Sequence, residues 1–127
     1  MTDKKLKPLK ATPVIKKVTV RMPANLKRQL PMQILSDGYN MRQKSTWVVE
    51  SIRSLMQNKD WEGALLSESI VSADTQDVFS IPSDLVNKIN SEARRVSMEK
   101  PSLNANQSSI IRAAINRRML GFFKLVE

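Results

Sequence analysis

The feature that most constrains the fold of this chain is a pattern of residues that occurs twice. Each copy starts with a short run in which apolar and polar residues alternate, as in a half-buried β-strand, and a proline closes the run. Apolar residues at helical spacing follow, and a second helical run begins near a serine. The prolines, Pro23 and Pro82, are 59 residues apart, and the serines, Ser45 and Ser108, are 63 apart. This repeat predicts two copies of one strand–helix–helix unit.

Both predicted strands present two different faces. The apolar faces consist of Val18, Val20 and Met22 in the first strand and of Phe79 and Ile81 in the second. The opposite faces consist of Lys17, Thr19 and Arg21 in the first strand and of Gln76, Val78 and Ser80 in the second. Asp77 stands where the first strand has Val18, which weakens the apolar face of the second strand. The two-residue period therefore predicts one face for a core and one face free for another use.

Four helices are predicted from apolar residues three or four positions apart. Their buried stripes are expected at Leu26, Leu30 and Ile34; at Trp47, Val48, Ile52, Leu55 and Met56; at Leu85, Ile89, Ala93 and Val96; and at Ile111, Ala114, Ile115 and Met119. Ser45, Ser83 and Ser108 are the predicted N-caps, because a serine hydroxyl accepts a hydrogen bond from a free helical amide. Gly38 is placed to end the first helix, and Pro31 predicts a kink or a break within it.

The charge of the chain narrows the choice of partner. Its formal net charge is +9 and its pI is about 10.2, which favours a polyanion. Residues 1–53 contain twelve Lys or Arg and three Asp or Glu, so the excess gathers around the first strand, although charged runs are often only solvated faces. Nucleic acid fits better than a membrane surface, because the first half lacks the bulky apolar anchors of a membrane-binding helix.

The residue types also exclude several classes of protein. The chain contains no histidine, no cysteine and only three glycines, so the usual general bases, thiol nucleophiles and glycine-rich phosphate loops are missing. We therefore predict no enzyme activity, no cofactor and no metal site. No apolar run reaches the length of a membrane span, and no apolar segment follows the first lysines as in a secretory signal. A cytoplasmic protein is expected.

Two pairs of segments carry a resemblance to a known family. The segments VTVRMPANL and KSTWVVESIRSLM, and in the second half FSIPSDLVNKI and QSSIIRAAINRRML, resemble the ribbon-helix-helix family of DNA-binding proteins. The resemblance covers residues 16–57 as a first motif and residues 75–120 as a second motif. It implies a mainly α fold with a short two-stranded antiparallel β-ribbon, in which the two motifs form an intramolecular pseudo-dimer.

The resemblance also implies a mechanism and a set of site residues. In the family the ribbon enters the DNA major groove, and the N-terminus of each second helix anchors a phosphate. The residues expected to read bases are Lys17, Thr19, Arg21, Gln76, Val78 and Ser80. Those expected at phosphates are Arg42, Lys44, Ser45, Thr46, Ser108 and Ser109. Arg112, Arg117 and Arg118 are expected either to add phosphate contacts or to be solvated. The polar strand face has an alternative use as a charged edge that prevents aggregation.

Three segments lie outside the two motifs. Residues 1–15 are lysine-rich and broken by proline, which predicts a disordered basic arm that can follow DNA phosphates. The lysines assigned to this arm are Lys4, Lys5, Lys7, Lys10 and Lys16. Residues 58–74 form an acidic linker, expected to pack partly on the helices through Trp61, Leu65, Leu66, Ile70 and Val71. Residues 121–127 form an apolar tail, suited to packing or self-association through Phe122, Phe123 and Leu125.

The resulting expectation is a sequence-specific, double-stranded DNA-binding protein that regulates transcription. Single-chain tandem members of the family occur on conjugative plasmids, and this analogy suggests a plasmid or another mobile element, with the protein at the nucleoid or the plasmid. An architectural relaxosome or partition protein is the alternative. An antitoxin fits less well, because the second half repeats the folded motif instead of forming a tail.

The two strands are expected to pair within one chain, residues 17–22 with residues 76–81. The linker holds the second strand at a high effective concentration, whereas pairing two first strands would crowd four cations together. The ribbon would then be asymmetric and its DNA site non-palindromic. The competing arrangement is an exchanged dimer with first strand on first strand, which would require a palindrome.

Overall fold

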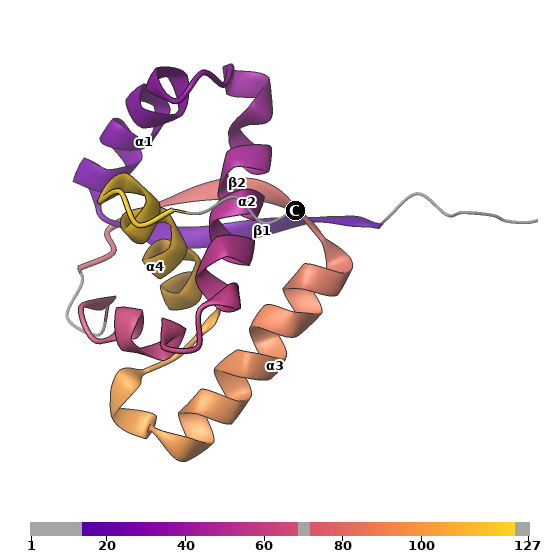
Figure 1. Ribbon diagram of the computed structural model, residues 1–127, viewed down its shortest axis with the longest axis vertical. Coiled ribbons are helices and arrows are strands. Elements are labelled where there is room, and N and C mark those ends of the chain that lie inside the picture. Colours follow the sequence, from indigo (N-terminus) through magenta and orange to yellow (C-terminus); the bar gives the residue numbers. More distant parts are fainter. Residues whose placement is uncertain (1–13, 69–71, 124–127) are drawn as a thin grey trace, which may run out of the picture.

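The computed structural model describes residues 14–68 and 72–123 of the 127-residue chain. Within these residues the fold is mainly helical, with four α-helices and a two-stranded antiparallel sheet (Figure 1). In chain order the main elements are β1 (Ile15–Met22), α1 (Ala24–Ser36), α2 (Lys44–Gln57), β2 (Thr75–Pro82), α3 (Ser83–Glu99) and α4 (Gln107–Met119). Short 3-10 helices lie between them at η2 (Met41–Gln43), η3 (Trp61–Leu65) and η5 (Pro101–Leu103). The order strand–helix–helix therefore occurs twice, as predicted.

The two strands pair with each other, so the ribbon forms within one chain as predicted. The register places Lys17 opposite Ser80, Thr19 opposite Val78, and Arg21 opposite Gln76. Because the strands are antiparallel, α1 leaves one end of the ribbon and α3 leaves the other (Figure 1). Lys16, which was predicted as part of the basic arm, instead lies inside β1 opposite Ile81.

The inner face of the ribbon lies at the centre of the core. Its buried residues are Val18, Val20, Met22, Phe79 and Ile81. The four predicted helical stripes are buried with it, except that Met56 and Met119 are only partly buried. The helix α4 contacts β1, α2, α3 and η3, so apolar residues on several of its sides are buried. Each large apolar side chain buried in this way contributes roughly 1.5–3 kcal/mol to the stability of the fold. Because α4 contacts β1 and α2 of the first unit, it joins the two halves of the chain.

The helix α1 continues through a proline, because tertiary packing outweighs the local effect of that residue. Pro31 lies inside the helix, and the predicted break at this residue is wrong. A proline in a helix interior removes a backbone hydrogen bond and costs about 3 kcal/mol. Leu30 and Ile34 are fully buried on either side of it and hold the helix in place. The helix ends at Ser36, and Gly38, which was expected to end it, follows two residues later with a φ of +91° that favours glycine. The Tyr39 N–H donates to the Ile34 carbonyl at 3.1 Å and so closes the helix end.

None of the three serines predicted as N-caps caps its helix. The helix α2 follows directly on η2, whose N-terminus is capped by Asn40, and α4 is capped by Asn106. The helix α3 begins at Ser83 itself and has no side-chain cap. Capping is a local rule, whereas the Ser45 and Ser108 hydroxyls meet strand N–H groups that only the folded chain brings within reach.

In the segment between the two units, η3 packs on α2 and α4. Trp61 and Leu65 of η3 are buried, whereas Leu66 is exposed. The predictions made for Lys4, Lys5, Lys7, Lys10, Ile70, Val71 and Leu125 fall outside the described residues. Over the ranges that the structure does describe, no helix has both the length and the apolar character needed to cross a membrane.

Candidate nucleic-acid interface

The outer face of the ribbon brings together all six residues predicted to read bases. They alternate with the buried residues of each strand, at Lys17, Thr19, Arg21, Gln76, Val78 and Ser80. Ser80 is half-buried and the other five are exposed. Lys17 and Arg21 are four residues apart, a distance of about 13 Å along an extended strand. This face therefore carries two cations on β1 and no charged residue on β2.

Two serine hydroxyls support the edges of the ribbon. Ser45 of α2 accepts a hydrogen bond from the Ser80 N–H of β2 at 2.8 Å, and Ser108 of α4 accepts one from the Arg21 N–H of β1 at 3.1 Å. Each helix thus binds the strand of the other strand–helix–helix unit. The bonds satisfy N–H groups at the edge of a two-stranded sheet, where the ladder supplies no partner.

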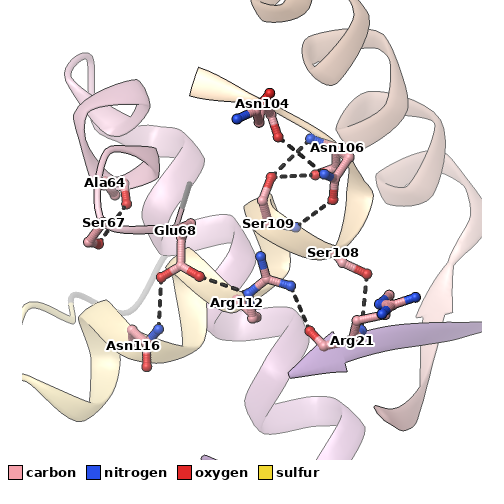
Figure 2. A network of polar contacts seen from close by, with 10 residues as sticks. All are labelled: Arg21, Ala64, Ser67, Glu68, Asn104, Asn106, Ser108, Ser109, Arg112 and Asn116. Atoms are coloured by element: carbon pink, nitrogen blue, oxygen red, sulfur yellow. Dashed lines mark hydrogen bonds and ion pairs between the residues drawn. The ribbon is translucent and has the colours of Figure 1, made fainter. Parts of the chain in front are cut away.

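The ribbon is held most extensively around Arg21. The Arg21 carbonyl accepts a hydrogen bond from Arg112 Nη1 at 2.7 Å (Figure 2), and Arg21 Nη2 donates to the Ala73 carbonyl at 3.3 Å. On the opposite strand, the Gln76 carbonyl accepts a hydrogen bond from Lys27 Nζ at 2.8 Å. Side chains from α1 and α4 therefore fix the backbone at this end of the ribbon.

The residues predicted to contact phosphate at the start of α2 differ in their surroundings. Arg42 and Thr46 are exposed. Lys44 is half-buried and forms an ion pair with Asp77, with Nζ and Oδ1 3.0 Å apart, and Nζ lies 5.1 Å from the centre of the Phe79 ring. The ion pair also explains how Asp77 is accommodated on the inner side of β2, because the carboxylate there has a cationic partner.

The start of α4 is closed by its own side chains. Ser109 is buried, and its N–H donates to Asn106 Oδ1 at 2.9 Å while its hydroxyl accepts from the Asn106 N–H at 2.9 Å. These two bonds satisfy backbone donors that would otherwise be free at a helix N-terminus. The Ser109 side chain therefore belongs to the helix cap, whereas Ser108 is half-buried at the ribbon.

Two arginines of α4 lie in surroundings that differ from those predicted from the sequence. Arg112 and Arg118 are buried, so both predicted roles, phosphate contact and solvation, are wrong for them. Arg112 forms an ion pair with Glu68, with Nε and Oε1 2.8 Å apart. Arg117 is half-buried, and its guanidinium lies 5.2 Å from the centre of the exposed Phe122 ring. A buried guanidinium is stable where acceptors surround it, and these acceptors come from distant parts of the chain.

Two linker residues that the sequence did not single out also support the ribbon. Glu68 accepts hydrogen bonds from Arg112 and Asn116. Asp74 Oδ1 accepts one from the Ala24 N–H at 3.1 Å, at the start of α1. The only signal in the sequence is the position of Arg112 within the apolar run IIRAAI, because a charge in such a run needs a buried partner.

Comparison of the chain with protein-family models, with curated proteins and with solved structures finds no match. Among the described residues, no group of three or more His, Cys, Asp or Glu side chains is arranged to hold a metal ion. The outer face of the ribbon and the side chains that support it form the candidate functional site.

Proposed function

We propose that this chain is a sequence-specific, double-stranded DNA-binding protein that regulates transcription with the outer face of its ribbon in the major groove. The observation that carries the proposal is the ribbon, whose inner face is buried while the six predicted base-reading side chains share the other face. The major groove of B-DNA is about 12 Å wide and admits a two-stranded ribbon. The resemblance to ribbon-helix-helix proteins supports the role in transcription.

The side chains on this face suit distinct bases. The guanidinium of Arg21 can donate to O6 and N7 of guanine, Gln76 can pair with adenine, and Val78 can contact the methyl group of thymine. Arg21 and Gln76 are opposite each other, so both strands contribute to reading at this end. In the free chain Arg21 donates to the neutral Ala73 carbonyl, an acceptor that a guanine can replace.

We further propose that the two units form an intramolecular pseudo-dimer. The bonds from Ser80 to Ser45 and from Arg21 to Ser108 support this arrangement, because Ser80 and Arg21 each lie two residues before the repeated proline. A two-fold interface makes each contact twice with the roles exchanged. The paired strands differ in sequence, so the proposed DNA site is non-palindromic.

Phosphate contacts are proposed at the helix starts and along the basic arm. The residues concerned are Arg42 of η2, Lys44, Ser45 and Thr46 of α2, Ser108 of α4, the arm lysines Lys4, Lys5, Lys7 and Lys10, and Lys16 of β1. A helix N-terminus attracts anions through its free amides and its dipole. Ser109 is not included, because its N–H and its hydroxyl are both bonded to Asn106.

Selection of bound sequences from a random duplex library tests the proposal. The wild-type chain is expected to enrich one non-palindromic sequence and to prefer it as duplex DNA over single-stranded DNA or RNA. Arg21→Ala is expected to weaken binding to that site by about 1–3 kcal/mol and to relax the preference at one guanine. The matched control Arg94→Ala removes an exposed guanidinium from α3 and is expected to keep the preference. Enrichment of no sequence, or a preference that Arg21→Ala leaves unchanged, would contradict the proposal.

A further inference from the structure

Arg112 connects the linker with the Arg21 end of the ribbon. Its Nη1 donates to the Arg21 carbonyl at 2.7 Å, and its Nε donates to Glu68 Oε1 at 2.8 Å (Figure 2). The other oxygen of Glu68 accepts from Asn116 Nδ2 at 2.9 Å. The side chains of Arg112 and Glu68 are 7% and 2% exposed, so both charges are removed from water. Such a pair keeps one geometry, because displacing either partner leaves a buried charge uncompensated.

The helix α4 fixes both backbone polar groups of Arg21. The Arg21 N–H donates to Ser108 Oγ at 3.1 Å, and the Arg21 carbonyl accepts from Arg112. These bonds hold the two peptide groups on either side of the Arg21 Cα, and so they set the point from which the exposed side chain starts. A bidentate contact with a base needs its donors placed within about 0.5 Å, so this placement affects recognition directly.

The other end of the ribbon is supported differently. Ser80 matches Arg21 in the repeat, and its N–H has the equivalent bond, to Ser45 Oγ at 2.8 Å. The residue that matches Arg112, 63 positions earlier, is Val49, whose side chain has no hydrogen-bond donor. The hydrogen bond that Arg112 donates to the Arg21 carbonyl therefore has no equivalent from Val49. Within residues 14–68 and 72–123, Ser108, Arg112 and Lys27 bond to the backbone at the Arg21–Gln76 end, whereas Ser45 bonds to it at the Lys17–Ser80 end.

We infer that Arg112, held by Glu68, is a positioning residue that sets how strictly bases are recognised at the Arg21–Gln76 end of the ribbon. The inference rests on the proposed function, because it concerns the same face and the same DNA. It gives the linker a part in specificity, since Glu68 lies in the segment between the two units. The Arg21–Gln76 end is expected to discriminate between bases more strictly than the Lys17–Ser80 end.

Competition between duplexes that differ by one base pair tests the inference on the site selected by the wild-type chain. Arg21→Ala and Lys17→Ala first identify the base pair that each end reads. Arg112→Met keeps much of the side-chain volume without its donors. It is expected to relax discrimination about tenfold at the Arg21 base pair and to leave the Lys17 base pair within about twofold of wild type. In combination with Arg21→Ala, it is expected to add little, because both changes act on one contact.

Two further variants separate positioning from stability. Ile115→Val removes one methylene-sized group from the buried surface of α4 and leaves Arg21 untouched. It is expected to lower the melting temperature and to leave both base preferences unchanged. Glu68→Gln removes the charge but keeps the shape of the side chain, and it is expected to relax the Arg21 base pair to a smaller extent than Arg112→Met. It provides the measurement if Arg112→Met does not fold.

The outcomes distinguish the inference from the function on which it rests. An equal loss of affinity at every base pair in Arg112→Met and Glu68→Gln would overturn the inference and leave Arg112 with a purely structural role. The proposed function would survive that result, because Arg21→Ala would still change one base pair. If the wild-type chain selected no sequence, or if Arg21→Ala changed no preference, the proposed function would fail, and the inference would fail with it.

Discussion

Arg118 shows how one side chain can join distant parts of the chain. Its Nη1 donates to the Trp47 carbonyl at 3.0 Å and lies 3.3 Å from Glu50 Oε1, and its Nη2 donates to the Tyr39 hydroxyl at 3.2 Å. The side chain is 6% exposed, and its guanidinium lies close to the rings of Tyr39, Trp47 and Phe123. A planar, weakly hydrated cation suits such aromatic surroundings. Arg118 therefore holds α4 against α2 and against the turn after α1.

Replacing Arg118 is expected to destabilise the fold strongly. Arg118→Ala removes the cation from a buried network and leaves the Glu50 carboxylate without this cationic partner, which should lower the free energy of unfolding by about 3 kcal/mol. Arg117→Ala is the neighbouring control and should cost less than about 1 kcal/mol, because the aromatic ring beside its guanidinium, that of Phe122, is exposed. Urea unfolding of both variants measures the difference. Equal midpoints would show that the Arg118 network contributes little.

Tyr39 provides an optical test of the same network. Burial raises the pKa of Tyr39 above its usual 10.0, and the hydrogen bond it donates to Glu50 raises it further, against the opposing effect of Arg118. A raised pKa in the folded state means that its contribution to stability is complete below pH 10 and is lost as the pH rises through the folded pKa. Because the chain has one tyrosine, the ultraviolet absorbance of tyrosinate reports this group alone.

The titration midpoint of the folded chain is expected above that of the chain unfolded in urea. Glu50→Gln should lower the folded midpoint, because the neutral amide no longer favours the protonated phenol as strongly. A folded midpoint at or below the unfolded one would contradict this description of the Tyr39 site.

The sequence predicted the side chains of the ribbon face well and those of its supports poorly. The faces of β1 and β2 follow from the period of a strand, which is a local property, so Lys17, Thr19 and Arg21 could be placed without the fold. Arg112 and Arg118 could not, because their acceptors lie 44 and 71 positions away, at Glu68 and Trp47. An isolated arginine on a helix is usually solvated, and only the tertiary structure reveals the exception.

At the scale of elements, residues of the linker form ion pairs and hydrogen bonds with three of the helices. Glu62 of η3 forms ion pairs with Arg95 of α3 at 2.6 Å and with Lys100 at 2.9 Å. Further along, Glu68 holds α4 and Asp74 accepts a hydrogen bond from the first amide of α1. The repeat predicted the order of the elements, but not these contacts, because the linker has no counterpart within either repeated unit.

The ion pairs of Glu62 are expected to make stability depend on pH. Hydrogen bonds from Arg95 and Lys100 lower the pKa of Glu62 below its usual 4.5, so the stabilisation is present above pH 4.5 and is lost as the pH falls through the lowered value.

Glu62→Gln should therefore cost about 0.5–1 kcal/mol at pH 7 and much less in strong acid. Urea unfolding at both pH values measures this. Glu99→Gln is the control, because Glu99 also forms an ion pair with Arg95 but is more exposed than Glu62. A Glu62→Gln effect that did not change with pH would contradict the ion-pair explanation.

At the scale of the whole molecule, the pairing of β1 with β2 joins the two strand–helix–helix units of one chain. Thr19 and Val78 are opposite each other, and the N–H groups of the neighbouring Arg21 and Ser80 bond outside the ladder, to Ser108 and Ser45. This pattern marks Thr19 and Val78 as a non-hydrogen-bonded pair, in which the Cα atoms are about 4.5 Å apart. That separation suits a disulfide.

A disulfide between these positions tests the pairing in solution. The chain has no cysteine, so Thr19→Cys/Val78→Cys introduces the only two thiols. Mild oxidation in dilute protein is expected to give a crosslinked monomer. A control with Thr19→Cys and Met98→Cys, the second on the exposed surface of α3, should not crosslink within the chain. Crosslinking of Thr19→Cys/Val78→Cys only between chains would instead indicate an exchanged dimer.

The basic arm is expected to contribute charge to binding without contributing specificity. Deleting residues 2–13 removes four lysines but leaves β1, which begins at Ile15, and Val14, whose carbonyl accepts from the Ser83 N–H at 2.8 Å. The slope of log K against log salt should fall by about one to three units, since each neutralised phosphate accounts for roughly 0.9. Titrations of the selected duplex at several salt concentrations measure the slope. An unchanged slope would show that the arm does not contact DNA.

The pairing of β1 with β2 joins residues that lie 53 to 67 positions apart. During translation, the first unit therefore leaves the ribosome well before the strand that completes the ribbon has been made. Contacts at such separations also form late in folding, because closing a long loop costs entropy. A truncated translation product or a proteolytic fragment that ends before Thr75 would keep most of the positive charge of the chain but would have no ribbon. Such fragments are expected to bind nucleic acids without selectivity, and not to compete with the folded protein for its own site.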